Sequence, residues 1–106
     1  MLREETVVRT IKAYLKKLPI KVDEAIIFGS TARGERLYDS DIDLIVISED
    51  FKRMDPHERM ALLFRFWKRK HRRVALEAFG FTKDEYQERL KKSLWFKDID
   101  KHGIKV

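Results

Sequence analysis

The chain has 106 residues, of which 43% are hydrophobic and 40% are charged, and it contains no cysteine. This length and composition predict a single domain over residues 1–106 with a modest core, and they exclude disulfides and cysteine-ligated zinc. The sequence has no apolar run long enough to span a membrane, and its first residues lack the apolar segment of a signal peptide, so we expect a cytoplasmic protein with no membrane association. The net charge of +6 would suit a nucleic acid, a polyanionic nucleotide or an acidic protein, and does not choose among them.

The first half of the chain alternates helices and strands. Apolar residues at helical spacing predict a helix over residues 3–18, which Pro19 ends. Residues 24–28 read as a short apolar strand, and residues 31–37 as a short helix. Residues 41–48 predict a second strand, whose continuous apolar run is typical of a central strand that is covered on both faces.

The second half repeats this alternation. Asp55-Pro56-His57-Glu58 supplies an N-cap, a proline at the first helical position and a capping box, and the helix that it opens is expected to run to about Lys70. Residues 74–79 predict a third strand, and residues 82–85 cap a helix that extends to about Lys91.

The tail, residues 94–106, is expected to form a further helical turn that breaks at Gly103. Three strands with about four helices indicate an α/β (α+β) layered fold around a small three-stranded sheet. The periodicity alone leaves the strand directions open.

Two acids stand at the start of the second predicted strand. Residues i and i+2 of a strand point to the same face, so the carboxylates of Asp41 and Asp43 aim at one spot. Like charges beside a buried strand are costly unless a cation lies between them, and Mg²⁺ is typically bound by one or two carboxylates together with substrate phosphates. We therefore predict a site for Mg²⁺, with two ions expected and Mn²⁺ as an alternative. The competing interpretation is a solvated strand end, which the apolar run after Asp43 makes less favourable.

A small-residue turn, Gly29-Ser30, precedes these acids in the chain. Backbone N–H groups and a hydroxyl at a helix start suit a phosphate group, whereas the plain alternative is a strand-to-helix turn with Ser30 as N-cap. Arg33 follows closely and has the planar fork that binds a triphosphate, although a salt bridge to a local acid is equally compatible with its position.

The Gly29-Ser30 pair, ten intervening residues and Asp41-Ile42-Asp43 resemble the signature of the DNA polymerase beta nucleotidyltransferase superfamily. The short chain resembles its minimal nucleotidyltransferase branch, and the resemblance covers roughly residues 22–86. It implies a mixed sheet of the polymerase-beta type, a Gly-Ser turn that holds the terminal phosphates, and acids that bind Mg²⁺. It also implies a third acid from a later strand, for which Glu77 is the candidate where the family has Asp. The alternative for Glu77 is a surface residue on an edge strand.

The function that these features favour is metal-dependent transfer of a nucleoside monophosphate, AMP from ATP in the simplest case, to a hydroxyl acceptor. Asp41, Asp43 and Glu77 would be the catalytic and metal-binding residues, and Gly29, Ser30 and Arg33 would bind the nucleotide. The alternative is a non-catalytic nucleotide-binding or protein-interaction module of a two-protein complex. A nucleic-acid-binding domain is less favoured, because a basic run such as residues 68–73 is more often the solvated end of a helix.

Two apolar clusters, residues 60–67 and residues 94–96, exceed what one core-facing stripe needs. Either the sheet and other helices enclose each cluster as core, or part of it forms an interface, for which we expect Phe64 and Trp67 or Trp95 and Phe96. The resemblance implies the partner: a protein of the higher-eukaryote-and-prokaryote nucleotide-binding (HEPN) type, a toxin to which this chain would be the antitoxin. In such pairs the nucleotidyltransferase can adenylylate a tyrosine of the toxin.

Overall fold

The computed structural model describes residues 4–29, 32, 41–67 and 74–106. Its elements, in chain order, are α1 (Glu4–Lys17), β1 (Glu24–Phe28), β2 (Ile42–Ile47), the short 3-10 helix η1 (Glu49–Arg53), α2 (Pro56–Arg65), β3 (Leu76–Phe81), α3 (Lys83–Lys92), α4 (Leu94–His102) and β4 (Ile104–Lys105).

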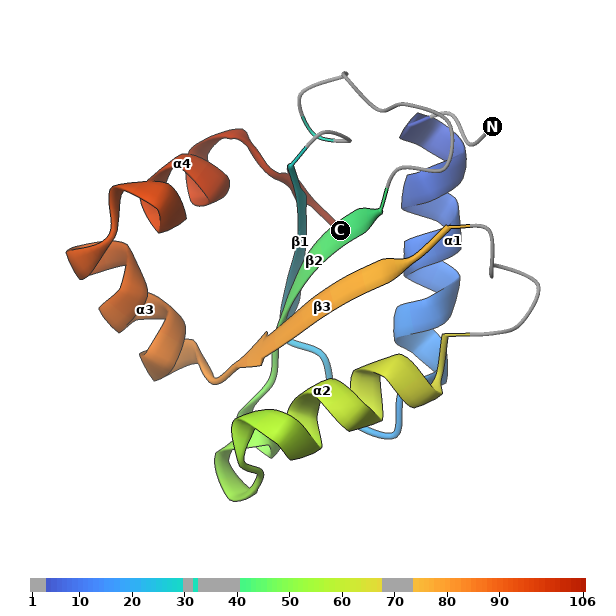
Figure 1. Ribbon diagram of the computed structural model, residues 1–106, viewed down its shortest axis with the longest axis horizontal. Helices are drawn as coiled ribbons and strands as arrows, with labels where there is room; N and C mark the ends of the chain where they lie inside the picture. The colour runs from blue at the N-terminus through green and yellow to red at the C-terminus, as the bar shows by residue number, and fades with distance from the viewer. Residues whose placement is uncertain (1–3, 30–31, 33–40, 68–73) are drawn as a thin grey trace.

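One sheet, in the strand order β3-β2-β1-β4, forms the middle layer of the molecule (Figure 1). β1 pairs antiparallel with both β2 and β4, whereas β2 and β3 run parallel. The helix α2 makes the crossover that a parallel pair requires. The sheet is therefore mixed, as the family resemblance implies.

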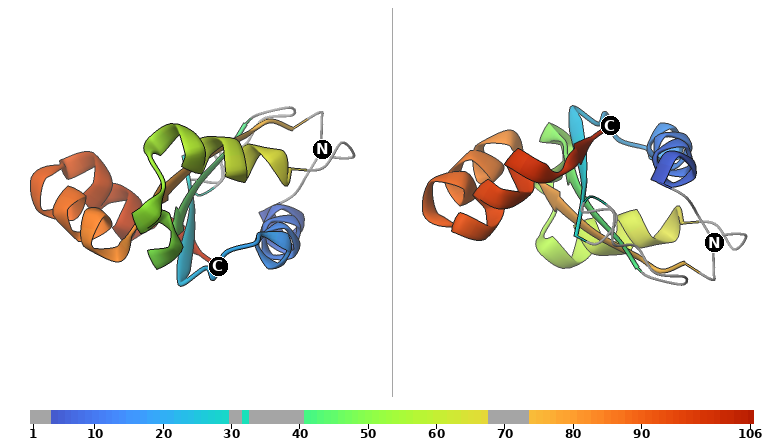
Figure 2. Two further views of the ribbon diagram at one scale, coloured as in Figure 1. Left: turned by 90° about the horizontal axis from the view of Figure 1, so that it is seen from below. Right: turned by 90° about the horizontal axis from the view of Figure 1, so that it is seen from above.

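Helices cover both faces of the sheet, as the end-on views in Figure 2 show. On one side, which we call the α1/α2 face, the strands pack against Val7 and Ile11 of α1 and against Leu63 of α2. On the other side, the α3/α4 face, they pack against Tyr86 of α3 and Phe96 of α4. Two separate apolar clusters result, one on each face of a single sheet.

Among the described residues, the predicted helices and strands are confirmed in kind, with two larger differences in extent, whereas the helix predicted over residues 31–37 lies outside the described residues. α2 ends at Arg65 rather than near Lys70, because the chain tightens there: the N–H of Trp67 donates to the carbonyl of Phe64, three residues back. The third strand spans residues 76–81 rather than 74–79. Its register is set by its pairing with β2, in which Ile42 lies opposite Leu76, and a propensity pattern does not contain that information.

The prediction of three strands is wrong by one. The tail forms α4 and then turns back to add β4 to the edge of β1, so that the sheet has four strands. The turn depends on close approach at Gly103, where a Cβ atom would lie 2.4 Å from Cγ2 of Ile26. A strand of two residues carries no periodicity of its own, so only the tertiary contact reveals it.

None of the helices in the described part of the chain combines the length and the apolar composition that crossing a membrane requires.

Candidate active site

The predicted acids stand at one end of the β2–β3 pair. Asp43 is the second residue of β2 and lies opposite Glu77, the second residue of β3, in the parallel register. The pairing continues back toward Asp41, because the N–H of Ile42 donates to the carbonyl of Ala75 at 2.8 Å. Neighbouring strands lie about 4.8 Å apart, and register partners share a face of the sheet. The structure therefore brings Asp43 and Glu77 to adjacent positions on the α3/α4 face, with Asp41 preceding them.

Burial differs among these acids. Asp43 is half-buried, whereas Asp41 and Glu77 are exposed. Asp43 is therefore the least exposed to solvent of the three acids.

Gly29 ends β1 directly against Asp43. Its φ of 76° lies in the left-handed region, and a Cβ atom at this position would lie 2.3 Å from Oδ2 of Asp43. Both the conformation and the space require glycine here. The turn backbone and the carboxylate are therefore in contact, which the spacing in the sequence did not show. Ser30, Arg33, the predicted helix over residues 31–37 and the basic run of residues 68–73 lie outside the described residues.

The donor set suits a hard divalent cation, because Mg²⁺ favours carboxylate oxygens and completes its shell with water and substrate phosphates. Among the described residues, however, no three His, Cys, Asp or Glu side chains gather closely enough to hold an ion by themselves. The carboxylates fit Mg²⁺ as part of a shell to which a nucleotide would contribute the remaining oxygens.

A cavity of about 360 Å³ opens beside Asp43. Gly29 and Asp43 line it on the sheet side, and Trp95, Asp98 and His102 of α4 line it on the opposite side. Sequence reasoning missed Asp98 and His102. The spacing of residues 95, 98 and 102 would have put them on one helix face, but only if the tail had been read as a full helix with Ser93 as N-cap.

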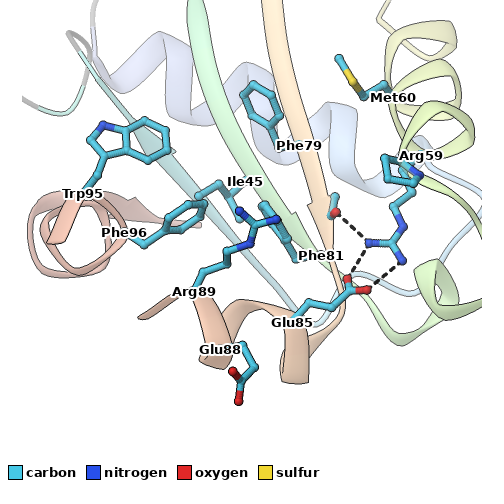
Figure 3. A pocket seen from close by; sticks show the side chains of 12 residues that line it. Ile45, Arg59, Met60, Phe79, Phe81, Glu85, Glu88, Arg89, Trp95 and Phe96 are labelled. Atoms are coloured by element: carbon cyan, nitrogen blue, oxygen red, sulfur yellow. Dashed lines mark hydrogen bonds and ion pairs between the residues drawn. The ribbon is translucent and has the colours of Figure 1, made fainter. Parts of the chain in front are cut away.

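A larger groove of about 610 Å³ lies farther along the same face, between α2 and the α3–α4 pair (Figure 3). Phe79 and Phe81 of β3 line it, with Arg89 of α3 on one side and Met60 of α2 on the other. The guanidinium of Arg89 stands 5.6 Å from the ring centre of Phe81 and 5.7 Å from that of Phe96. The groove thus combines aromatic surface with a cation held against it.

A smaller hollow of about 230 Å³ continues from this groove to the candidate site. It shares Met60 and Phe79 with the larger groove, and its other lining residues include Glu77 and Phe64. The two hollows together form what we call the β3 groove, which leads along the edge strand of the sheet to Glu77.

A buried arginine fixes one wall of the β3 groove. Arg59 of α2 is 8% exposed and donates to both carboxylate oxygens of Glu85 and to the carbonyl of Gly80 (Figure 3). It also donates to the carbonyls of Phe51 and Met54. The hydrogen bond from Arg59 holds the pKa of Glu85 below its ordinary value. This network joins α2, β3 and α3 and thereby holds together the wall of the groove at that end.

Tyr86 joins the two helices of the α3/α4 face. Its hydroxyl donates to Oδ1 of Asp100 at 3.0 Å, and burial together with this acid raises the pKa of the phenol. This hydrogen bond ties α4, which lines the cavity beside Asp43, to α3.

The arrangement of turn, acids and strands agrees with comparisons to known proteins. The profile of the nucleotidyltransferase domain family matches residues 8–102, which is most of the chain. The chain belongs to this family. A crystal structure from Sulfolobus solfataricus, whose own assignment as a nucleotidyltransferase is provisional, superposes with a TM-score of 0.54 at 26% sequence identity, covering 80% of this chain and 71% of that one. No curated protein sequence matches the chain significantly.

Family and fold together make this nucleotidyltransferase domain a nucleotide-using transferase in general terms. Neither the family nor the fold specifies the nucleotide, the metal or the acceptor.

Proposed function

We propose that this nucleotidyltransferase moves AMP from ATP to a hydroxyl group of an acceptor and releases pyrophosphate. The observation that carries the proposal is the placement of Asp43: it is the register partner of Glu77 and lies against the Gly29 turn. A turn suited to phosphate, in contact with one of two paired carboxylates, supports this proposal because in-line transfer at a phosphoryl group is catalysed mainly by positioning and charge stabilisation.

In this proposal, the backbone of Gly29 and the hydroxyl of Ser30 hold the β- and γ-phosphates, and Arg33 binds the triphosphate. Asp41, Asp43 and Glu77 are the ligands for Mg²⁺. When bound, Mg²⁺ would neutralise phosphate charge and polarise the reacting phosphoryl group.

The transfer step balances as follows. The acceptor oxygen forms a bond to the α-phosphorus of ATP, while the bond from that phosphorus to the bridging oxygen of pyrophosphate breaks. Glu77 takes the proton of the acceptor hydroxyl. Glu77 suits this role because it is exposed at the end of the β3 groove, where an acceptor can reach it.

The direct test is transfer of radiolabelled AMP from ATP in the presence of Mg²⁺, with proteins from the native source as acceptors. The variant Asp41→Ala/Asp43→Ala should lose at least about a thousandfold in rate, because several kcal/mol of charge stabilisation depend on these ligands. If the intact protein transfers no more label than this variant, the enzyme proposal fails. Tight binding of Mg²⁺-ATP by the intact protein without turnover would then favour the non-catalytic module.

We further propose that the acceptor is a tyrosine of a HEPN-type partner, which this chain would silence as an antitoxin. The support from this structure is its exposed apolar surface. Four large apolar side chains are strongly exposed among the described residues, namely Met60, Phe64, Leu94 and Trp95, and three of them line the β3 groove. Trp67 and Phe96 do not belong to that surface. Trp67 is half-buried and donates from Nε1 to the carbonyl of Val74, and Phe96 is part of the core.

Phe64 offers the sharper test of the partner proposal, because it is 72% exposed and lines the hollow that contains Glu77. Phe64→Ser should weaken the complex with the HEPN-type protein while changing the free energy of unfolding by less than about 0.5 kcal/mol. Leu94→Ser is the matched control, because Leu94 is 82% exposed and lines none of the hollows described above.

Size-exclusion chromatography and mass spectrometry of the co-purified proteins supply the readouts, since an added adenylyl group appears as a fixed mass increment on the partner. A complex that is equally tight with Phe64→Ser and with the intact protein would remove the β3 groove from the interface. A partner that never gains the increment would contradict the tyrosine acceptor.

A further inference from the structure

The cavity beside Asp43 has a second wall, formed by α4, whose residues have no role in the proposed transfer step. The carboxylates and the turn lie on its sheet side, and α4 closes the opposite side with Trp95, Asp98 and His102. From this wall we infer that α4 binds the nucleoside of the donor nucleotide, with Trp95 against the base and Asp98 facing the ribose hydroxyls. The inference rests on the proposed function and adds to it the residues that recognise the nucleoside.

The geometry of α4 supports this assignment. Residues 95, 98 and 102 follow the i, i+3, i+7 spacing of a single helix face. Ile99 lies on the same side of the helix and is buried against the sheet, which fixes the rotation of α4 about its axis. The face that α4 turns toward Asp43 is therefore defined by packing.

Trp95 has the placement of a stacking residue. Its ring meets Phe28 at 5.7 Å and Phe96 at 5.1 Å, both edge to face, yet 57% of the residue remains exposed. Two aromatic contacts hold the indole at the mouth of the cavity, and the exposed remainder offers apolar surface there. A purine that packs on such a ring gains stacking energy that does not depend on the identity of the base.

Asp98 and His102 supply polar groups at the other end of the same wall. Nε2 of His102 lies 3.7 Å from Oδ1 of Asp98, and both side chains are mostly exposed. A carboxylate accepts hydrogen bonds from the two hydroxyls of a ribose, as the acidic residue of dinucleotide-binding sites does. The imidazole beside it can orient that carboxylate. With the phosphates held at Gly29, this wall lies where the ribose and the base would extend.

The volume agrees with this ligand. About 360 Å³ falls within the range of cavities that bind small molecules, and the lining combines two aromatic side chains, Phe28 and Trp95, with a few polar groups. A site for phosphate alone would need no aromatic wall.

The test compares binding of Mg²⁺-ATP and of Mg²⁺-tripolyphosphate by calorimetry, because tripolyphosphate has the phosphates without the nucleoside. We expect the intact protein to bind ATP more tightly, and Trp95→Ala to weaken ATP binding at least about fivefold while leaving tripolyphosphate binding unchanged. Trp95→Phe, which keeps an aromatic ring, should retain most of the affinity for ATP. Leu94→Ala is the control one residue away and should alter neither ligand.

Asp98→Asn tests the ribose contact separately. It should weaken ATP by about threefold and leave 2′,3′-dideoxy-ATP unaffected. The inference is overturned if the intact protein binds tripolyphosphate as tightly as ATP, or if Trp95→Ala lowers both affinities equally. Either result leaves the proposed transfer chemistry standing, whereas inactivity of the intact protein in the transfer assay removes that chemistry without deciding which wall the nucleoside contacts.

Discussion

The two faces of the sheet differ in what covers them. On the α1/α2 face, the strand residues Ile42, Leu44 and Val46 are all fully buried under α1 and α2. On the α3/α4 face, the first side chain of β2 is that of half-buried Asp43, and the helices leave open the β3 groove and the cavity beside Asp43. Farther along β2, Ile45 and Ile47 are buried on this face too, so the strand stabilises the fold through both faces and presents Asp43 only near its start. The alternation of side chains along the strand places Asp43 and its neighbour Leu44 on opposite faces.

Neighbouring residues of β2 offer the strongest test of this separation. Leu44→Ala should lower the free energy of unfolding by about 2–5 kcal/mol, because it leaves a cavity in the α1/α2 cluster. Asp43→Asn, one residue away on the opposite face, should change it by less than about 1 kcal/mol and yet abolish transfer. Urea denaturation and the AMP-transfer assay measure the two effects. An equal loss of stability in Leu44→Ala and Asp43→Asn would contradict the assignment of Leu44 to the core and of Asp43 to the site.

Arg59 of α2 links the two faces through its bonds to Glu85 of α3, and its replacement should lower stability nearly as much as Leu44→Ala. Arg59→Met keeps the aliphatic stem but removes one donor from each of three carbonyls and the cationic partner of Glu85, so we expect a loss of about 3 kcal/mol. Thermal unfolding checks the value. Arg53→Met, a change in an exposed arginine of η1, should be close to neutral. A comparable effect of both changes would mean that the buried network adds nothing specific.

The effect of Mg²⁺ should depend on the nucleotide. Because the described acids do not form a ligand set by themselves, Mg²⁺ alone should stabilise the protein little, whereas Mg²⁺ and ATP at a hundred times their dissociation constant should add about 2.7 kcal/mol. Differential scanning fluorimetry with each ligand alone and with both separates these cases. Asp43→Asn should remove the joint effect and leave the starting melting temperature nearly unchanged. Full stabilisation by Mg²⁺ alone would show a preformed metal site instead.

The smallest expected effect is a pH dependence at the edge of the α3/α4 face. The pKa of Glu85 is lower in the folded protein than in the unfolded chain, chiefly because Arg59 donates to the carboxylate. Its contribution to stability is therefore fully present above the unfolded value of about 4.3 and is lost as the pH falls through the folded pKa. The contribution is small because the side chain is 44% exposed. Glu85→Gln should flatten the acid limb of the stability curve. An unchanged limb would assign the acid sensitivity to other carboxylates.

Much of the secondary structure could be predicted because its signals are local. The capping boxes at Asp55 and Thr82 begin α2 and α3 where the sequence places them, and the apolar run after Asp43 forms β2. The first residue of β3 could not be predicted, because it depends on pairing with β2. The end of α2 was missed because the apolar spacing continues past Arg65, where the backbone tightens into a turn between Phe64 and Trp67.

For the candidate site, the sequence by itself determined which residues were available: a glycine turn, two acids two residues apart and a later Glu77. It also predicted that Asp41 and Asp43 share a face, since the period of a strand is two; in the structure Asp43 is in β2, and Asp41 directly precedes the strand. Tertiary structure decided the rest. The parallel pairing of β2 and β3 brought Glu77 beside Asp43, and the left-handed turn at Gly29 came into contact with the carboxylate. The return of the tail as α4 and β4 then placed Trp95, Asp98 and His102 across the cavity from Asp43. These are contacts between segments that are not adjacent in the sequence, and they follow from how the apolar faces pack, which no local pattern specifies.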